Sequence, residues 1–219
     1  ALDAEDTGNN NTAVGFLALT ALNYDGDGYN TAVGTQAGAA VSTGVQNTLI
    51  GGLAGDALQD ADRNVAIGYQ ALSADDLGSR TVAIGAGAAL LQNYASATDS
   101  HNTCIGDLAG LYNVTGVKNT WLGSAAGVGA SGQSNSNNTG VGYNTGLRIT
   151  TGTLNTLIGS LAGDALTTGS SNTLIGYGSS TTAVDSVNTI VLGINVSGAT
   201  NYTTLGNGSN DIRAAHGNV

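Results

Sequence analysis

Asn155-Thr156-Leu157-Ile158-Gly159 is one copy of a five-residue unit that recurs along almost the whole chain. The same five letters stand at 47–51 and at 172–176, and looser copies lie between them. A fixed period of this size is the sequence signature of a repeat architecture. The final glycine marks each unit, usually 17 residues after the one before it, at positions 15, 34, 51, 68, 85, 106, 123, 142, 159, 176, 193 and 206.

The residues just before the marker glycine predict a short β-strand in each unit. Position −1, directly before the glycine, is Val, Ile or Leu in all 12 units, and position −3 is Thr in nine of them. Two positions that are two residues apart share one face of an extended strand. Thr, Val and Ile also favour strands. The repeat therefore predicts a stack of short parallel strands in a β-solenoid.

Position −2 points to the opposite face of each strand, and it is apolar as well. It is occupied, for example, by Ala13, Leu49, Trp121, Leu157 and Leu174. A strand that is apolar on both faces is normally buried on both faces, whereas a single solenoid covers one. We expect positions −1 and −3 to face the interior and position −2 to face identical chains around a shared axis. Trp121 would crowd such an axis.

Other positions of the unit predict how each turn closes. Asn stands at position −4 in nine units, and stacked amides of this kind form hydrogen-bonded ladders. After the marker glycine the pattern x-x-Ala-Gly, as in 159–163, predicts a bend into a second, smaller-residue strand. Two strands and two corners per turn give about 12 turns, a length on the order of 55–60 Å at the spacing of neighbouring strands. The repeat domain spans 1–206, and 207–219 is a C-terminal extension.

The composition excludes several classes of protein. With 41% hydrophobic residues the chain is too apolar to be disordered. Its net charge of −10 makes a nucleic acid or an anionic membrane surface an unfavourable partner. It has no apolar run of 18 residues that would insert into a membrane, and its single cysteine, Cys104, excludes an internal disulfide. The chain opens in mid-pattern without a signal peptide, as a piece of a longer protein would.

The units Asn-Thr-x-Ile-Gly-x-x-Ala-Gly, seen best at 47–55, 102–110 and 155–163, resemble the head repeats of YadA-like trimeric adhesins and, more closely, the related repeats of bacteriophage tail fibres. The similarity covers about residues 8–206. It implies a left-handed parallel β-roll, an intertwined or side-by-side homotrimer, at a virion surface or in an extracellular fibre. The chain departs from the bacterial wording Ser-Val-Ala-Ile-Gly, which only 65–68 and 82–85 approach, and its period of 17 is longer than is typical of those repeats.

Three insertions precede the Asn corner, at 19–29, 90–101 and 130–137. Loops held by a rigid scaffold often bind ligands, and tyrosines beside acids and amides suit a host cell-surface glycan or protein. The first two insertions supply the candidate receptor contacts, although solvated loop tips are the plainer interpretation of the same residues. The candidates are Tyr24, Asp25, Asp27, Tyr29, Asn93, Tyr94 and His101.

No catalytic constellation or cofactor motif accompanies the repeat, so we expect a structural protein and not an enzyme. The run 25–28 alternates Asp and Gly but lacks the further acids that a calcium loop needs, and no metal is predicted. A depolymerase would need a carboxylate pair in a groove, which the repeat does not single out. An ice- or mineral-binding solenoid needs an exposed Thr column, whereas this Thr column is expected to be buried. The sequence favours a trimeric spacer of a phage tail fibre that presents loops for host attachment, with the head of a bacterial trimeric autotransporter adhesin as the alternative.

Overall fold

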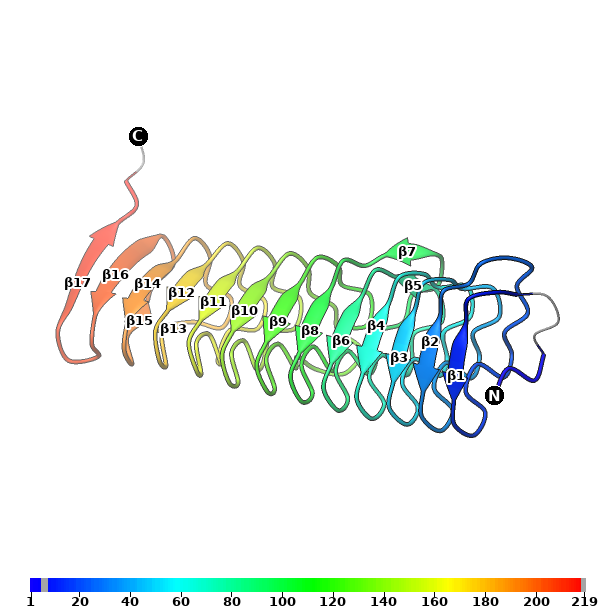
Figure 1. Ribbon diagram of the computed structural model, residues 1–219. Helices are drawn as coiled ribbons and strands as arrows, with labels where there is room; N and C mark the ends of the chain where they lie inside the picture. The colour runs from blue at the N-terminus through cyan, green and yellow to red at the C-terminus, as the bar shows by residue number, and fades with distance from the viewer. Residues whose placement is uncertain (5–7, 218–219) are drawn as a thin grey trace.

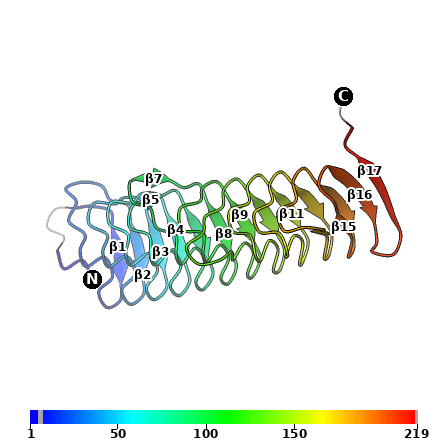
Figure 2. The ribbon, with the colours of Figure 1, turned by 180° about the vertical axis from the view of Figure 1, so that it is seen from behind.

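The computed structural model describes residues 1–4 and 8–217 and is a long parallel β-solenoid (Figure 1). The described residues form strands and turns and no helix. One strand per repeat unit joins a single sheet that runs the length of the molecule, and the view from behind shows the same continuous stack (Figure 2). Its parallel strands are β1 (Thr12–Val14), β2 (Thr31–Val33), β3 (Thr48–Ile50), β4 (Val65–Ile67), β6 (Val82–Ile84), β8 (Thr103–Ile105), β9 (Thr120–Leu122), β10 (Thr139–Val141), β11 (Thr156–Ile158), β12 (Thr173–Ile175), β14 (Ile190–Gly193) and β16 (Tyr202–Gly206).

The register of the sheet follows the sequence repeat. Thr156 pairs with Thr173 and Leu157 with Leu174, and equivalent unit positions pair in the same way along the stack. The predicted all-β parallel solenoid is therefore confirmed. The twelve parallel strands enclose about 11 turns of the solenoid, and we had expected about 12.

The two faces of the sheet are the reverse of our expectation. The position −2 residues are buried in the solenoid interior from Ala32 to Thr204, and Ala13 in the first strand is half-buried. Positions −1 and −3 point outward instead, and none of their residues is buried in the single chain. The assignment of position −2 to an interface between chains was wrong, because both sets of side chains are apolar and strand alternation alone does not tell inside from outside.

The interior is narrow, and where one turn has a large side chain the residues beside it are small. Position −2 packs with a column of small residues at position +3, three residues after the marker glycine, which is mostly alanine. Trp121 is fully buried there because its neighbours are glycines. A Cβ atom on Gly140 would lie 2.3 Å from the indole, and one on Gly127 would lie 2.2 Å from it. The indole therefore occupies the space that larger residues fill in other turns.

The predicted asparagine ladder is confirmed. The Asn47 side-chain oxygen accepts a hydrogen bond of 2.9 Å from the backbone N–H of Asn64, and equivalent bonds continue through Asn119, Asn138 and Asn155. From Asn30 onward the amide nitrogens also donate across the corner, as Asn155 Nδ2 does to the Gly169 carbonyl oxygen at 2.9 Å. The ladder thus satisfies buried backbone groups that no strand would pair.

The rest of each turn is irregular backbone, not the second strand that we expected. Residue +2 after the marker glycine, for example Leu53 with φ 59°, has a left-handed conformation in successive turns. Its N–H bonds to the turn before, as Leu53 N–H does to the Thr35 oxygen at 2.9 Å. Outside the main sheet, the described residues form two short parallel pairs, β5 (Gly78–Ser79) with β7 (Thr98–Asp99) and β13 (Ser180–Thr181) with β15 (Ser197–Gly198), and an isolated parallel bridge between Asn9 and Asp27.

The parallel stack ends at β16, and the chain then reverses direction. β17 (Asp211–Ala215) pairs antiparallel with β16, and all five of its residues are exposed. This antiparallel strand forms one end of the molecule in Figure 1. It interrupts the column of equivalent residues that defines the rest of the sheet.

The marker glycines are required by the close approach of successive turns, and Gly51→Ala tests this. Gly51 has φ 133°, and a Cβ atom there would lie 2.5 Å from the Gly68 carbonyl oxygen. We expect Gly51→Ala to destabilise the fold by about 2–3 kcal/mol or more. Gly52→Ala is the matched control, because its Cβ would have no contact nearer than 3.6 Å. Equal urea midpoints for the two variants would contradict this packing.

Candidate functional site

The outer surface of the sheet, which we call the outward face, is defined by positions −3 and −1. An aliphatic column at position −1 runs beside a column at position −3 that is threonine in nine units. Position −1 is the more exposed of the two, with Val14 58% and Leu122 43% accessible. The half-buried threonines of position −3 lie beside it. Apolar side chains thus repeat in every turn of the stack on one side of the molecule. Isolated exposed aliphatic residues are ordinary, but a contiguous apolar face of this kind marks a surface that binds something.

Two further columns border the outward face, one at each end of the strands. Position −5, which we call the −5 edge, has positive φ in every unit, and its residues are exposed. Position +1, just after the marker glycine, we call the +1 edge. In five units it holds a large exposed apolar side chain, namely Phe16, Tyr69, Tyr143, Tyr177 and Ile194, and in the others a small or polar residue.

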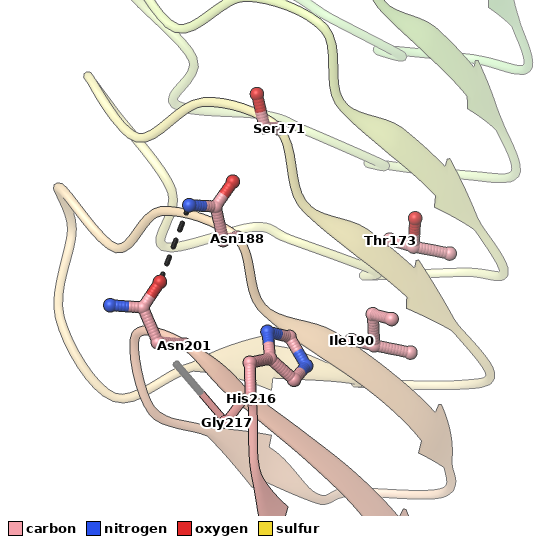
Figure 3. A pocket seen from close by; sticks show the side chains of 7 residues that line it. All are labelled: Ser171, Thr173, Asn188, Ile190, Asn201, His216 and Gly217. Atoms are coloured by element: carbon pink, nitrogen blue, oxygen red, sulfur yellow. Dashed lines mark hydrogen bonds between the residues drawn. The ribbon is translucent and has the colours of Figure 1, made fainter. Parts of the chain in front are cut away.

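A hollow of about 450 Å³ lies where the outward face meets the −5 edge near the C-terminal end. Figure 3 shows Ser171, Asn188 and Asn201 stacked along the −5 edge beside Thr173 and Ile190 of the strands. Asn188 Nδ2 donates to Asn201 Oδ1 at 3.3 Å. His216 and Gly217, in the segment after β17, complete the lining of the hollow. The lining is mostly polar, with the aliphatic side chain of Ile190 among it, and His216 Nε2 lies 2.9 Å from the Thr203 hydroxyl.

The four candidates of the first insertion lie within one exposed loop. The Tyr29 hydroxyl donates to Asp27 Oδ2 at 3.1 Å, and Asn10 Nδ2 donates to Asp27 Oδ1 at 2.9 Å. The hydrogen bond to Asp27 and the charge of its carboxylate raise the pKa of Tyr29. Tyr24 is 36% exposed and Tyr29 54%, so both rings are accessible. Asp25 is exposed as well.

The second insertion does not present its residues together. Asn93 and His101 are exposed, whereas Tyr94 is only 4% exposed. The Tyr94 hydroxyl donates to the Gly116 carbonyl oxygen at 2.8 Å and accepts from Asn102 Nδ2 at 3.2 Å. Tyr94 therefore supports the fold and is not placed to contact a receptor. This loop, with the projecting β7, stands out from the body of the solenoid in Figure 1.

Tyr94 belongs to a buried polar cluster that our reading of the sequence missed. Asp75 is fully buried, with Gly78 N–H donating to Oδ1 at 2.9 Å and Gln92 Nε2 donating to Oδ2 at 2.7 Å. Gln92 Oε1 in turn accepts from Asn102 Nδ2 at 2.9 Å. Burial raises the pKa of Asp75 to about 6, against the opposing effect of these hydrogen bonds, and the charge of Asp76 adds a smaller increase.

The cluster forms where the repeat pattern changes at two positions. Thr81 stands where most units have the ladder asparagine. The interior position +7 is leucine at Leu58, one turn before Asp75, and again at Leu166. In the three successive turns between them it is Asp75, Gln92 and Asn113. A comparison of position +7 along the units would have revealed this polar section.

Other reactive groups and metal-ligand clusters supply no further site in the described parts of the chain. Burial raises the pKa of the Cys104 thiol to about 12, so it stays protonated. Within residues 1–4 and 8–217, no group of three or more His, Cys, Asp or Glu side chains is placed to hold a metal ion. The described segments also contain no helix of the length and apolarity that would cross a membrane.

No protein-family model, curated protein or solved structure matches this chain. What the protein does must therefore be inferred from its repeat, its fold and its outward face.

The buried carboxyl group of Asp75 predicts that acidification stabilises this part of the fold. Its pKa is about 6 in the folded chain, against an ordinary value of 3.8, so the folded state binds the proton more tightly. The stabilisation is complete below the ordinary value and is lost as pH rises through about 6. At about 1.4 kcal/mol per pKa unit it amounts to no more than about 3 kcal/mol.

Thermal unfolding followed by circular dichroism from pH 4 to pH 7.5 measures this contribution. We expect the wild-type melting temperature to fall across that range by more than that of Asp75→Asn, which keeps the shape but cannot ionise. Asp185→Asn is the control for general charge effects, because it removes an exposed carboxylate in a distant turn. Identical pH profiles for the wild type and Asp75→Asn would contradict the prediction.

Proposed function

We propose that this chain is a segment of a trimeric bacteriophage tail fibre, a stiff left-handed β-roll that presents loops for attachment to a host cell. The observation that carries the proposal is the outward face, an apolar surface that a single chain leaves uncovered in every turn. The resemblance of the repeats to those of phage fibres is our reason for proposing three chains per assembly and a location at the virion surface.

The occupant that best fits the outward face is a second copy of the same chain. A covering partner must be apolar over the same length and must match the spacing of the strands, about 4.8 Å per turn. Another solenoid of the same sequence meets both conditions along its whole length. A narrow solenoid with mostly Ala in one interior column also has little core per turn, and oligomerisation is a usual source of added stability for small cores.

Host attachment is assigned to the first insertion and to the exposed residues of the second. Tyr24, Asp25 and Tyr29 are accessible on a loop that the stack holds in place, while Asn93 and His101 lie several turns away. Three copies of a weak loop site at fixed spacing bind a multivalent surface more tightly than one copy does. The ligand class is a cell-surface glycan or protein.

The head of a bacterial trimeric adhesin is the alternative from the same structural class. It would use the same outward face and the same loops, so the two differ only in what lies beyond the repeats. A membrane anchor encoded downstream would favour the adhesin, and a phage baseplate-attachment region encoded upstream would favour the fibre.

A second class of function, binding of ice or of a mineral surface, is favoured by the outward direction of the threonine column. Threonines of position −3 face outward on a regular sheet, as at Thr48, Thr156 and Thr173, which is what an ice- or mineral-binding face requires. The sequence-based objection that this column is buried inside the solenoid does not hold. Because ice binding needs the same face to be free, a monomer that shapes growing ice crystals would support it and contradict the trimer.

Solution mass is the direct test of the proposed assembly. We expect light scattering to give three times the 21.4 kDa chain mass at micromolar concentration. Ile158→Glu combined with Ile175→Glu places two charges on the outward face and is expected to yield monomers, because burying an unpaired charge is costly. Ala183→Glu with Val184→Glu adds the same charge at exposed positions away from that face and is expected to remain trimeric. A wild-type monomer would contradict the proposal.

The loop assignment is tested separately by binding of the labelled protein to candidate host cells or to a glycan array. Tyr24→Ala combined with Tyr29→Ala is expected to reduce binding at least about tenfold, since three linked sites weaken together. Its mass and circular dichroism should match the wild type, because both rings are accessible. The control is Tyr202→Ala, which removes an exposed ring far from this loop. Unchanged binding by the double variant would move the receptor site elsewhere.

A further inference from the structure

The −5 edge carries a row of basic side chains in a chain whose net charge is −10. Arg63, Arg80, His101 and Lys118 occupy this position in four successive units, and all four are exposed. Three of the chain's five Lys and Arg residues therefore lie in one line. The repeat itself does not require basic residues here, because units nearer the C-terminus place Asn, Leu or Ser at the same position. We call these four residues the basic row.

The −5 edge also joins the two insertions that supply the candidate receptor contacts. The first insertion ends at this edge with Tyr29, and the second ends there with His101. Gln46 stands in the one unit between Tyr29 and the basic row. Because neighbouring turns are about 4.8 Å apart, the exposed side chains from Tyr29 to Lys118 extend over roughly 24 Å. Two loops that lie far apart in the sequence thus open onto one linear surface.

The charge of the basic row is only partly neutralised within the chain. Arg80 Nε lies 2.9 Å from Asp99 Oδ1, in an exposed ion pair of a kind that contributes little in water. Arg63 Nε donates to the neutral side chain of Gln46 at 2.9 Å. In the described parts of the chain, Lys118 has no ion-pair partner. Like charges in adjacent turns repel one another, so an anion beside the row would be favourable.

The spacing and surroundings of the basic row suit an anionic polysaccharide better than a nucleic acid or a membrane. Duplex DNA carries one charge per roughly 1.7 Å of its axis, far denser than a single file of cations about 4.8 Å apart. Exposed carboxylates such as Asp60 and Asp107 would repel a densely charged polymer or a flat anionic bilayer beyond the row. A single glycan strand can follow the row alone, and its hydroxyl groups pair with an amide such as that of Gln46.

We propose that the basic row binds a linear acidic polysaccharide of the host surface, which lies along the stack with its carboxylate or sulfate groups beside Arg63, Arg80 and Lys118. This inference rests on the proposed host attachment and names its ligand class. Other copies of the chain cover the outward face while the row stays in water, because burying unpaired cations is costly. A trimer then offers three such rows to one multivalent surface.

Binding of the full chain to two pairs of immobilised polysaccharides tests the ligand class. Polygalacturonate is paired with its methyl ester, and dextran sulfate with dextran, so that each pair keeps the sugar backbone and differs in charge. We expect binding to at least one acidic member and to neither neutral one. Raising the salt from about 50 to about 200 mM should weaken the binding at least about fivefold, because a charged polymer releases its counterions on binding.

Matched charge variants test the assignment to the basic row. Arg63→Gln combined with Lys118→Gln is expected to weaken binding to the acidic polysaccharide at least about tenfold. Arg148→Gln combined with Arg213→Gln removes the same charge from exposed positions outside the row and is expected to bind as the wild type does. Asn137→Lys extends the row by one turn and is expected to tighten binding about threefold or more. Equal losses in the two double variants would overturn the assignment.

Assays with candidate host cells, neutral glycans, duplex DNA and phosphatidylserine vesicles distinguish the possible failures. Protein that binds host cells or neutral glycans but neither acidic polysaccharide overturns this inference and leaves the proposed attachment standing. Binding to DNA or to the vesicles that is tighter than binding to both acidic polysaccharides overturns the ligand class. Protein that binds none of the cells and glycans overturns both proposals. Binding to an acidic polysaccharide and to host cells, weakened together in the row variant, supports both.

Discussion

The structure depends on the stacking of each repeat position on its own equivalent in the next turn. Backbone groups of one turn bond to those of its neighbours, both in the strands and in the irregular segments between them. Because the chain contributes only three residues per strand in most turns, this pairing must be repeated many times to stabilise the fold. The asparagine ladder extends it into the corners, where amides such as Asn155 replace the missing backbone partners. A change of residue type in any column of equivalent positions therefore alters the contacts of the turns on both sides.

The chain accommodates such breaks by compensating substitutions close by. Where Trp121 enlarges one interior position, Gly140 in the next turn provides the volume. Where Thr81 interrupts the asparagine column, Gln92 and Tyr94 from the following insertion supply hydrogen bonds, and Asp75 joins them inside the solenoid. The insertion at 90–101, which we predicted to bind a receptor, thus also supplies hydrogen bonds where the asparagine ladder is interrupted. This dual use explains why Tyr94 is buried while its neighbour Asn93 is exposed.

Function on this scaffold lies outside the coil, on the outward face and the loops. The interior of the described stack is packed with alanine, leucine and valine side chains. The outward face carries an exposed aliphatic column along the stack, beside a column that is mostly threonine. The proposed fibre uses the face for assembly and leaves the loops for attachment.

The repeat alone was sufficient to predict the parallel strands, their register and the asparagine ladder, because a constant period leaves one way to stack equivalent residues. It was not sufficient to tell the inside of the coil from the outside. Leu157 and Ile158 are both aliphatic neighbours in one strand, yet the first is fully buried and the second is 39% exposed. Which of them turns inward depends on how the chain bends at the marker glycine and on what packs across the interior, and both arise from contacts between residues far apart in the unit. The missing second strand, the burial of Tyr94 and the reversal at β17 share that origin, since each depends on neighbouring turns or on the end of the stack and not on the local sequence.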